Sequence, residues 1–209
     1  MRAGKKGFTL LEMVISLSIL AVVAGILAVS FRLATGSIER GEAQTREMAR
    51  LRAGIGILER SIRSADIALV AAGEKPSPYF VGERNRIRFL SAAAMSAASG
   101  AGFRLLCFRE AEGAEGGGMA FSEGSPFRAD GVDAWEGTEG SRVLLPGASE
   151  VVFTYSPGPE EGGTWEWLDS WDAMETGRLP GAVRVEFTVT GEDGAPAKTA
   201  FVVPIFAGT

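Results

Sequence analysis

The pattern of apolar and polar positions separates a long N-terminal helical segment from a C-terminal part built of short strands. From Met13 to Val29 the only residues that are not apolar are two serines and one glycine. The stretch from Phe8 to Phe31 would form roughly 36 Å of helix, enough to cross a hydrocarbon core about 30 Å thick. A cleaved secretory signal is the alternative, but its apolar core runs to only about 7–15 residues. We therefore predict a membrane-spanning helix at residues 8–31, behind a leader at residues 1–7.

The helical pattern continues beyond this apolar segment, because apolar residues recur at spacings of three, four, three and four at Met48, Leu51, Ile55, Leu58 and Ile62. This spacing places them on one face of a helix. The same stripe is also compatible with a coiled-coil seam, although about two heptads are short for one. We predict one helix from about Thr9 to about Ala65, with residues 32–75 assigned to its continuation outside the membrane. Gly36 and Gly41 allow a local break in it.

Past residue 76 the pattern changes to short β segments separated by glycine-rich and proline-rich loops. The clearest strand is Ala182–Thr190, which alternates with a period of two. The other candidate strands are residues 79–81, 86–90, 103–109, 142–145, 151–155 and 199–206. A long helix followed by antiparallel strands predicts an α+β fold, with residues 76–209 as a globular antiparallel β domain.

Composition limits the chemistry of this chain. It contains no histidine, which excludes histidine-based triads and histidine-containing zinc sites. Its single cysteine, Cys107, cannot form an intramolecular disulfide, and its apolar surroundings in the sequence predict a small buried side chain. The net charge is −5, and the body without the basic leader is more acidic still, which argues against a nucleic-acid partner. We expect a protein that is not an enzyme and has no cofactor, metal or small-molecule substrate.

The charges near the N-terminus predict both an orientation and a functional residue. Arg2, Lys5 and Lys6 precede the apolar segment and should stay in the cytoplasm, so that everything after Arg32 faces outward. In a Gram-negative cell this places the C-terminal domain in the periplasm. Glu12 lies inside the predicted membrane helix, where a carboxylate costs on the order of 2.5–3.5 kcal/mol. Either it has a specific partner or it snorkels to the cytoplasmic interface.

The string Gly7-Phe8-Thr9-Leu10-Leu11-Glu12 resembles the class III signal of type IV pilins and type II secretion pseudopilins. The resemblance implies that a prepilin peptidase of the inner membrane cuts after Gly7 and methylates the new amine of Phe8. It also implies that Glu12 meets the N-terminal amine of a neighbouring subunit during assembly. Such a pairing would compensate a carboxylate in a low-dielectric helix bundle.

Within that superfamily, the C-terminal part is similar to the J-type minor pseudopilin (GspJ-like). The similarity lies in Leu144-Leu145-Pro146-Gly147, a strand ending at Tyr155, the Trp167/Trp171 pair and Leu179-Pro180-Gly181-Ala182-Val183. Val29 stands where major pilins usually carry a proline, whereas residues 80–91 lack the Arg-rich and Asn-Pro stretch of some J-type sequences. The resemblance implies a structural subunit of the pseudopilus tip, whose partners are the I-type and K-type minor pseudopilins and the major pseudopilin. A minor pilin of a type IV pilus is the alternative, followed by a membrane-anchored periplasmic enzyme.

Tryptophans and acidic residues gather between residues 135 and 172. We expect Trp165 and Trp167 to share one face of a strand and Trp171 to follow it. These rings either cover a sheet or dock a partner, since tryptophan is enriched in interface hot spots. Together with three residues of the helical stripe, they form the candidate partner interface: Met48, Leu51, Ile55, Trp165, Trp167 and Trp171. The acidic residues match no calcium loop and are expected to be solvated; they are Glu160, Glu161, Glu166, Asp169 and Asp172.

Overall fold

The structure is a computed structural model that describes residues 9–67, 69–72, 75–92, 102–111, 117–127, 132, 134–159, 163–190 and 195–205. The side chains of these residues are described except at 33–45 and 69–77. The chain divides into two compact units, Met1–Ala49 and Arg50–Thr209.

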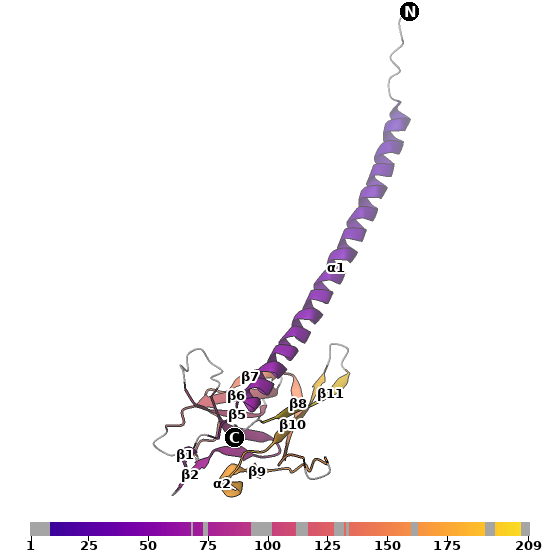
Figure 1. Ribbon diagram of the computed structural model, residues 1–209. Helices are drawn as coiled ribbons and strands as arrows, with labels where there is room; N and C mark the ends of the chain where they lie inside the picture. Colours follow the sequence, from indigo (N-terminus) through magenta and orange to yellow (C-terminus); the bar gives the residue numbers. More distant parts are fainter. Residues whose placement is uncertain are drawn as a thin grey trace, which may run out of the picture. The chain divides into compact units, whose positions relative to one another are not determined.

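The first unit contains most of helix α1, which runs unbroken from Leu10 to Arg63 (Figure 1). The prediction of one helix over this part of the chain is confirmed, and the helix continues without a break through Gly36 and Gly41. Its first 23 residues, Leu10–Arg32, are long and apolar enough to cross a membrane. All of their side chains are exposed, which is consistent with a membrane anchor.

The last turns of α1 belong to the second unit and provide part of its core. Leu58 and Ile62 are fully buried, and Leu51 and Ile55 pack against the same core. Met48, the first residue of the predicted stripe, is 50% exposed. The apolar face of the helix therefore begins to pack at Leu51.

The helix ends at Arg63, close to the predicted end at about Ala65, and the stretch up to residue 75 that was assigned to its continuation includes strand β1, Leu69–Ala72. Ala65 instead forms a β-bridge with Ser91, and the Asp66 N–H donates to the Leu90 carbonyl at 2.9 Å. The hydroxyls of Ser64 and Ser91 lie 2.7 Å apart and share a hydrogen bond. The bond from Asp66 thus gives a backbone N–H beyond the helix end a partner on β4, and the chain turns into the β domain.

The described residues of the β domain form antiparallel sheets, which confirms the α+β prediction. The six-stranded sheet has the order β7-β6-β5-β4-β3-β9, the three-stranded sheet has the order β11-β10-β8, and β1 pairs with β2. The bounds are β1 Leu69–Ala72, β2 Lys75–Pro78, β3 Phe80–Gly82, β4 Arg86–Ser91, β5 Arg104–Ala111, β6 Gly118–Gly124, β7 Arg142–Pro146, β8 Ala148–Ser156, β9 Trp171–Asp172, β10 Ala182–Thr190 and β11 Pro196–Pro204, with a short helix α2 at Ala173–Thr176. Each of the seven predicted strands overlaps one of these strands.

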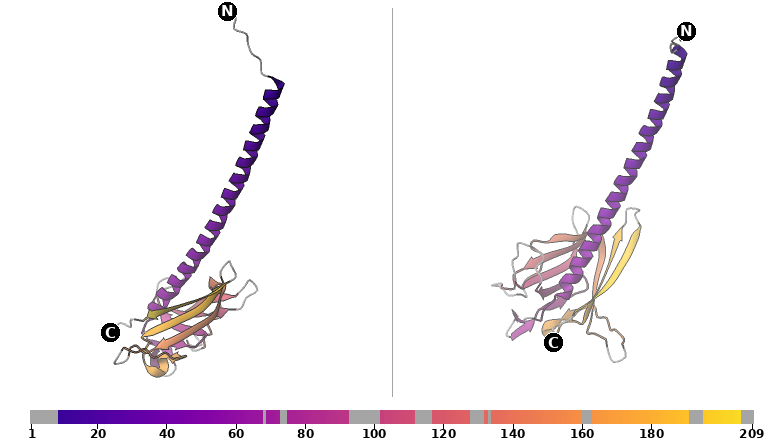
Figure 2. Two further views of the ribbon diagram at one scale, coloured as in Figure 1. Left: turned by 90° about the vertical axis from the view of Figure 1, so that its right-hand side faces the viewer. Right: turned by 45° about the horizontal axis from the view of Figure 1, so that its top comes forward.

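The main core joins both sheets to the last turns of α1 (Figure 2). A row of phenylalanines crosses the inner face of the six-stranded sheet, from Phe80 through Phe89 and Phe108 to Phe121. The successive ring centroids are 5.7, 6.1 and 6.4 Å apart, within the range of favourable aromatic pairs. Such a row ties four strands together through side chains as well as through the backbone ladder.

Several polar contacts join one sheet to the other, among them the hydrogen bond from the Phe153 N–H on β8 to the Arg84 carbonyl at 2.8 Å. The Tyr155 hydroxyl on β8 donates to the Glu83 carbonyl beyond β3 at 2.8 Å, and its ring lies directly against Gly82. The Glu110 carboxylate on β5 accepts hydrogen bonds from two consecutive backbone N–H groups of β8, the second from Val151 at 3.1 Å. The two sheets are therefore linked by specific hydrogen bonds at more than one place.

Candidate functional site

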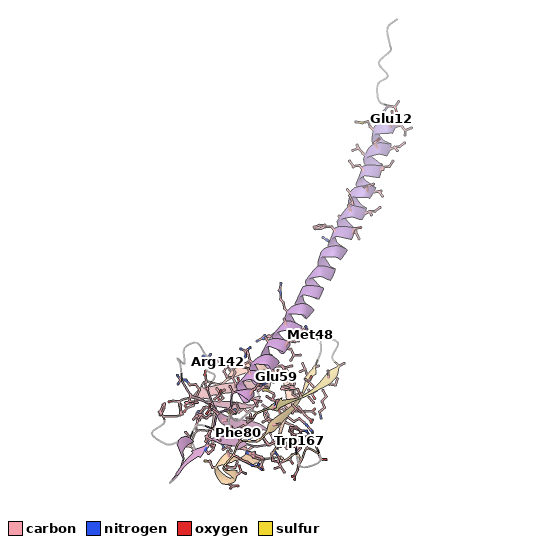
Figure 3. All side chains as sticks on the ribbon, viewed as in Figure 1. Glu12, Met48, Glu59, Phe80, Arg142 and Trp167 are labelled. Carbon is pink, nitrogen blue, oxygen red and sulfur yellow. The ribbon has the colours of Figure 1, made fainter. Side chains whose placement is uncertain are left out.

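The first candidate site is the start of α1, where Thr9 and Glu12 are described (Figure 3). The Thr9 carbonyl accepts the Met13 N–H at 3.2 Å, and the Thr9 hydroxyl oxygen accepts the Glu12 N–H at 3.3 Å. Glu12 thus lies in the first helical turn, and its side chain is exposed. Gly7 and Phe8, the predicted cleavage and methylation residues, lie outside the described residues.

The position of Glu12 allows a specific kind of contact. A carboxylate in the first turn of a helix is favoured by the helix dipole, yet this turn opens an apolar segment of membrane-spanning length. An exposed carboxylate there can accept hydrogen bonds from a cation presented by another chain. The exposed Glu12 carboxylate is therefore placed where it could pair with a cation on a neighbouring helix.

The second candidate site, the tryptophan cluster, separates into buried and exposed rings. Trp135 and Trp171 are buried, with 2% and 5% of their surface exposed. The Trp171 indole N–H donates to the Arg178 carbonyl at 3.0 Å. Trp171 therefore serves mainly as a core residue and offers little surface to a partner.

Trp165 and Trp167 lie in the connection between β8 and β9, and the prediction that they share a strand face is wrong. Trp165 forms only an isolated bridge with Pro159. The two rings nevertheless stack, with centroids 5.9 Å apart and planes 14° from parallel. The Arg184 guanidinium lies 4.0 Å from the centroid of Trp167 and adds a cation–π contact.

These residues belong to a partly exposed surface that we call the tryptophan patch, consisting of Trp165, Trp167, Arg184 and Val202. Arg184 on β10 is paired directly with Val202 on β11, so both side chains lie on one face of the three-stranded sheet. Trp165 is 40% exposed and Val202 46% exposed. That the tryptophan patch or Met48 contacts a partner stays a prediction.

The acidic residues of this region serve separate purposes. Asp169 forms an ion pair with Arg84 at 2.7 Å, and the Asp172 carboxylate caps α2 by accepting the Met174 N–H at 2.8 Å. Glu166 is exposed, whereas Glu160 and Glu161 lie outside the described residues. Among the described residues, no group of three or more acidic or cysteine side chains is placed to hold a metal ion.

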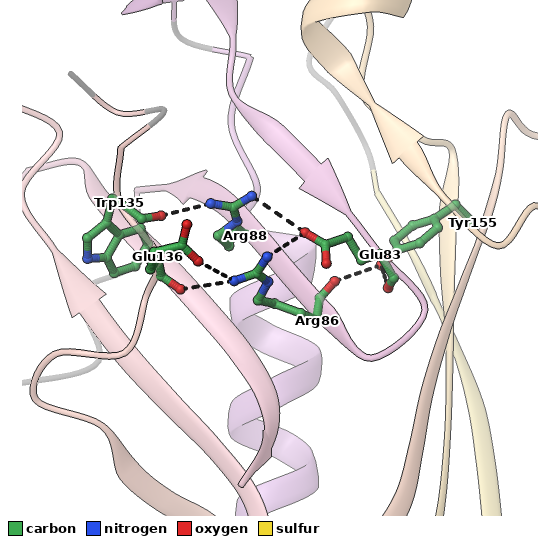
Figure 4. Close-up of polar contacts among 6 residues, drawn as sticks. All are labelled: Glu83, Arg86, Arg88, Trp135, Glu136 and Tyr155. Atoms are coloured by element: carbon green, nitrogen blue, oxygen red, sulfur yellow. Dashed lines mark hydrogen bonds and ion pairs between the residues drawn. The ribbon is translucent and has the colours of Figure 1, made fainter.

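A polar cluster that the sequence did not indicate lies on the outer face of the six-stranded sheet (Figure 4). Arg86 on β4 forms ion pairs with Glu83 at 2.8 Å and with Glu136 at 2.7 Å. Arg88 donates to the Trp135 carbonyl at 2.8 Å. The hydrogen bond from Arg86 holds the pKa of the Glu136 carboxyl below its usual value. These contacts fasten residues 134–141, which we call the strap, onto the sheet.

Cys107 lies under the strap. Gly137 has φ of 69°, and a side chain there would place its Cβ 2.6 Å from the Cys107 Sγ. The Ser122 hydroxyl donates to the Gly137 carbonyl and closes the strap over the thiol. Burial raises the pKa of Cys107 to about 11, although nearby arginines oppose this. The prediction that Cys107 is a small buried side chain is confirmed.

Residues 2–28 match the family of the prokaryotic N-terminal methylation motif. No curated protein matches the chain. The motif, followed by the apolar part of α1 and an antiparallel β domain, indicates a type IV pilin-like or pseudopilin protein.

Proposed function

We propose that this protein is a J-type minor pseudopilin of the type II secretion system. The observation that carries the proposal is the methylation motif at residues 2–28, which runs directly into an exposed apolar helix of membrane-spanning length. In this role the protein is a structural subunit and performs no chemistry itself. It joins the I-type and K-type minor pseudopilins and the major pseudopilin in a tip complex that supports export of folded proteins across the outer membrane.

Maturation in this proposal prepares the N-terminus for assembly. The prepilin peptidase removes residues 1–7 after Gly7 and methylates the amine of Phe8. Glu12 then pairs with the Phe8 amine of an adjacent subunit. Because a lone carboxylate in lipid is costly and a hydrogen-bonded ion pair is compensated, the contact favours docking at one axial offset.

The proposed location follows from the charges that flank the apolar segment. The basic residues of the leader remain in the cytoplasm, and α1 crosses the inner membrane once. The β domain then lies in the periplasm, where the pseudopilus assembles.

Three features of the chain support a minor subunit of the J type. No proline interrupts α1, so the helix continues straight through Val29, where major pilins usually have one. The Leu144-Leu145 pair that resembles the J type lies on β7 and packs against α1 at Gly54. Tyr155, from the same similarity, links the two sheets. The residues that carry the similarity to the J type therefore stabilise the β domain.

The tryptophan patch and Met48 are the surfaces that we propose for contacts with partner subunits. Stacked tryptophans beside an arginine combine the residue types most often found in interface hot spots. Leu51 and Ile55, which the sequence predicts in the same interface, already pack against the protein's own core. They hold the helix to the domain in this proposal.

Mass spectrometry of the N-terminal peptide from native membranes tests the processing step. We expect a peptide that begins with N-methylated Phe8. A retained Met1, or a cut near residue 30, would refute the pilin-like processing proposed here.

Assembly is tested by co-purification of the full-length protein from detergent-solubilised membranes. Two further minor pseudopilins in the complex would support the J-type proposal, and pilus adhesin components would favour a type IV minor pilin instead. Glu12→Ala should leave the β domain folded and reduce recovery of the complex. Glu175→Ala, which removes a first-turn carboxylate from α2, is the matched control and should have no effect.

A further inference from the structure

The tryptophans between residues 165 and 171 differ in what covers their rings. The Arg178 guanidinium lies 5.8 Å from the ring centroid of Trp171. The Arg184 guanidinium lies 4.0 Å from the ring centroid of Trp167. Among the described residues, no arginine or lysine lies over the Trp165 ring, and 40% of Trp165 is exposed. Of these three rings, Trp165 is therefore the one left open to a cation from outside the chain.

The Trp165 ring is restrained by its neighbour. It stacks on Trp167 with the two planes 14° from parallel, and Trp167 in turn packs against Arg184. The faces of an aromatic ring carry partial negative charge, so an indole attracts a cation within about 6 Å of its centroid. A ring that is already oriented loses little conformational entropy when a ligand stacks on it. The stacked pair is thus a preformed acceptor for a cation.

The charges around the two rings also favour a cation. Residues 157–177 contain six carboxylates and no lysine or arginine. Glu166, between the two tryptophans in the sequence, is exposed, whereas Asp169 is ion-paired with Arg84. The segment stays acidic when the positive charge of Arg184 is counted with it. A partner that brings positive charge is therefore attracted to this surface, and one that brings negative charge is repelled.

We propose that the tryptophan patch binds an arginine side chain of a neighbouring protein subunit, with the guanidinium stacked on the Trp165 ring. Arginine fits better than lysine because its guanidinium is planar, always charged and more weakly hydrated. The chain's own contacts at Trp167 and Trp171 use the same pairing. This inference deepens the role that the proposed function gives to the tryptophan patch. It rests on that function for the identity of the partner, but not for the preference for arginine.

Binding of short peptides to the full-length protein in neutral detergent micelles tests the preference for arginine. The probes are fluorescently labelled peptides in which glycine alternates with arginine, with lysine or with citrulline, an uncharged side chain of nearly the same shape as arginine. We expect the citrulline peptide to bind about tenfold more weakly than the arginine peptide, with the lysine peptide between them, because charge and planar shape both contribute. Equal binding of the arginine and citrulline peptides would overturn the proposal, as would tighter binding of the lysine peptide.

Variants at residue 165 test whether the ring is the docking point. Trp165→Leu removes the aromatic face and should weaken binding of the arginine peptide about tenfold. Trp165→Tyr keeps an aromatic face and should bind within about threefold of the wild type. Phe127→Leu is the matched control, because Phe127 is 90% exposed and lies outside the tryptophan patch. If Trp165→Leu binds as tightly as Phe127→Leu, or Trp165→Tyr as weakly as Trp165→Leu, the Trp165 ring does not hold the arginine.

Cross-linking tests the contact in the assembled complex. A photoreactive amino acid at Thr164, which is exposed and precedes Trp165, is activated in native membranes, and the cross-linked peptide is sequenced by mass spectrometry. We expect a peptide from another pseudopilin that contains arginine. Replacing that arginine by alanine should add no further loss of the complex to that of Trp165→Leu, because the two residues act through one contact.

A cross-linked peptide without arginine, or losses that add fully, would overturn the proposal. Failure of the proposed function is recognised separately. In that case the cross-linked partner would not be a pseudopilin, while the arginine peptide would still bind through Trp165.

Discussion

Gly54 and Gly56 lie two residues apart in α1, yet the structure predicts opposite effects for the same substitution at each. A Cβ at Gly54 would overlap the Leu145 side chain and lie 3.1 Å from the Leu144 carbonyl oxygen. A Cβ at Gly56 would meet nothing within 4 Å. In both cases alanine raises intrinsic helix stability by about 0.8–1.0 kcal/mol, so this contribution cancels when the two variants are compared.

The expected magnitudes follow from packing. Gly56→Ala should stabilise the protein by about 1 kcal/mol. Gly54→Ala must displace Leu145, which is fully buried and has little room to move, at a cost of about 1–3 kcal/mol. Gly54→Ala should therefore be less stable than Gly56→Ala by about 1–3 kcal/mol.

Thermal unfolding in mild detergent, followed through the fluorescence of the buried tryptophans, measures this difference. For a chain of this size, 1 kcal/mol corresponds to about 2–4 °C in Tm. We expect Gly56→Ala to unfold above the wild type and Gly54→Ala to unfold below it. Equal increases for both variants would refute the close packing of α1 against β7.

Two further predictions concern the β domain. Gly82→Ala should destabilise the protein by about 1–3 kcal/mol, because its Cβ would overlap the ring of Tyr155; chemical denaturation would measure the loss, and wild-type stability would contradict the close approach. Folding raises the pKa of the Cys107 thiol from its ordinary value of 9.0 to about 11. The stability that the buried, protonated thiol contributes is therefore complete below pH 9 and is lost as the pH rises towards 11. Between pH 9 and 10 the wild type should lose about 1 kcal/mol more stability than Cys107→Ala, as measured by denaturation at each pH, and parallel curves would contradict the raised pKa.

The elements that could be predicted from the sequence are those with a strong local pattern. The apolar run and the stripe through Leu58 and Ile62 identified α1, and the alternation in Ala182–Thr190 identified β10 with its observed bounds. Strand β6, Gly118–Gly124, was not predicted because its start coincides with a glycine-rich segment that indicates a loop. The predicted end of the helix at about Ala65 lies two residues past the observed end at Arg63, because the bridge from Ala65 to Ser91 depends on a distant strand.

The candidate sites likewise divide into those that consecutive residues reveal and those that only the fold brings together. The methylation motif is local and could be recognised from consecutive residues, including Glu12. Trp165 and Trp167 were predicted to share one face of a strand, whereas they lie in the connection between β8 and β9, where their rings stack on each other. The contact of Arg86 with Glu136 joins residues 50 positions apart, and neither residue is distinctive in the sequence. Only the folded sheet brings them together.

The burial of Cys107 under the strap has a practical consequence for mapping this protein's contacts. Its thiol is the only one in the chain, and it is both inaccessible and largely protonated at neutral pH. A cysteine introduced at Met48, Trp165 or Val202 would therefore be the only reactive thiol on the native protein. Site-directed cross-linking to neighbouring subunits could then proceed in the wild-type background, without first removing the native cysteine.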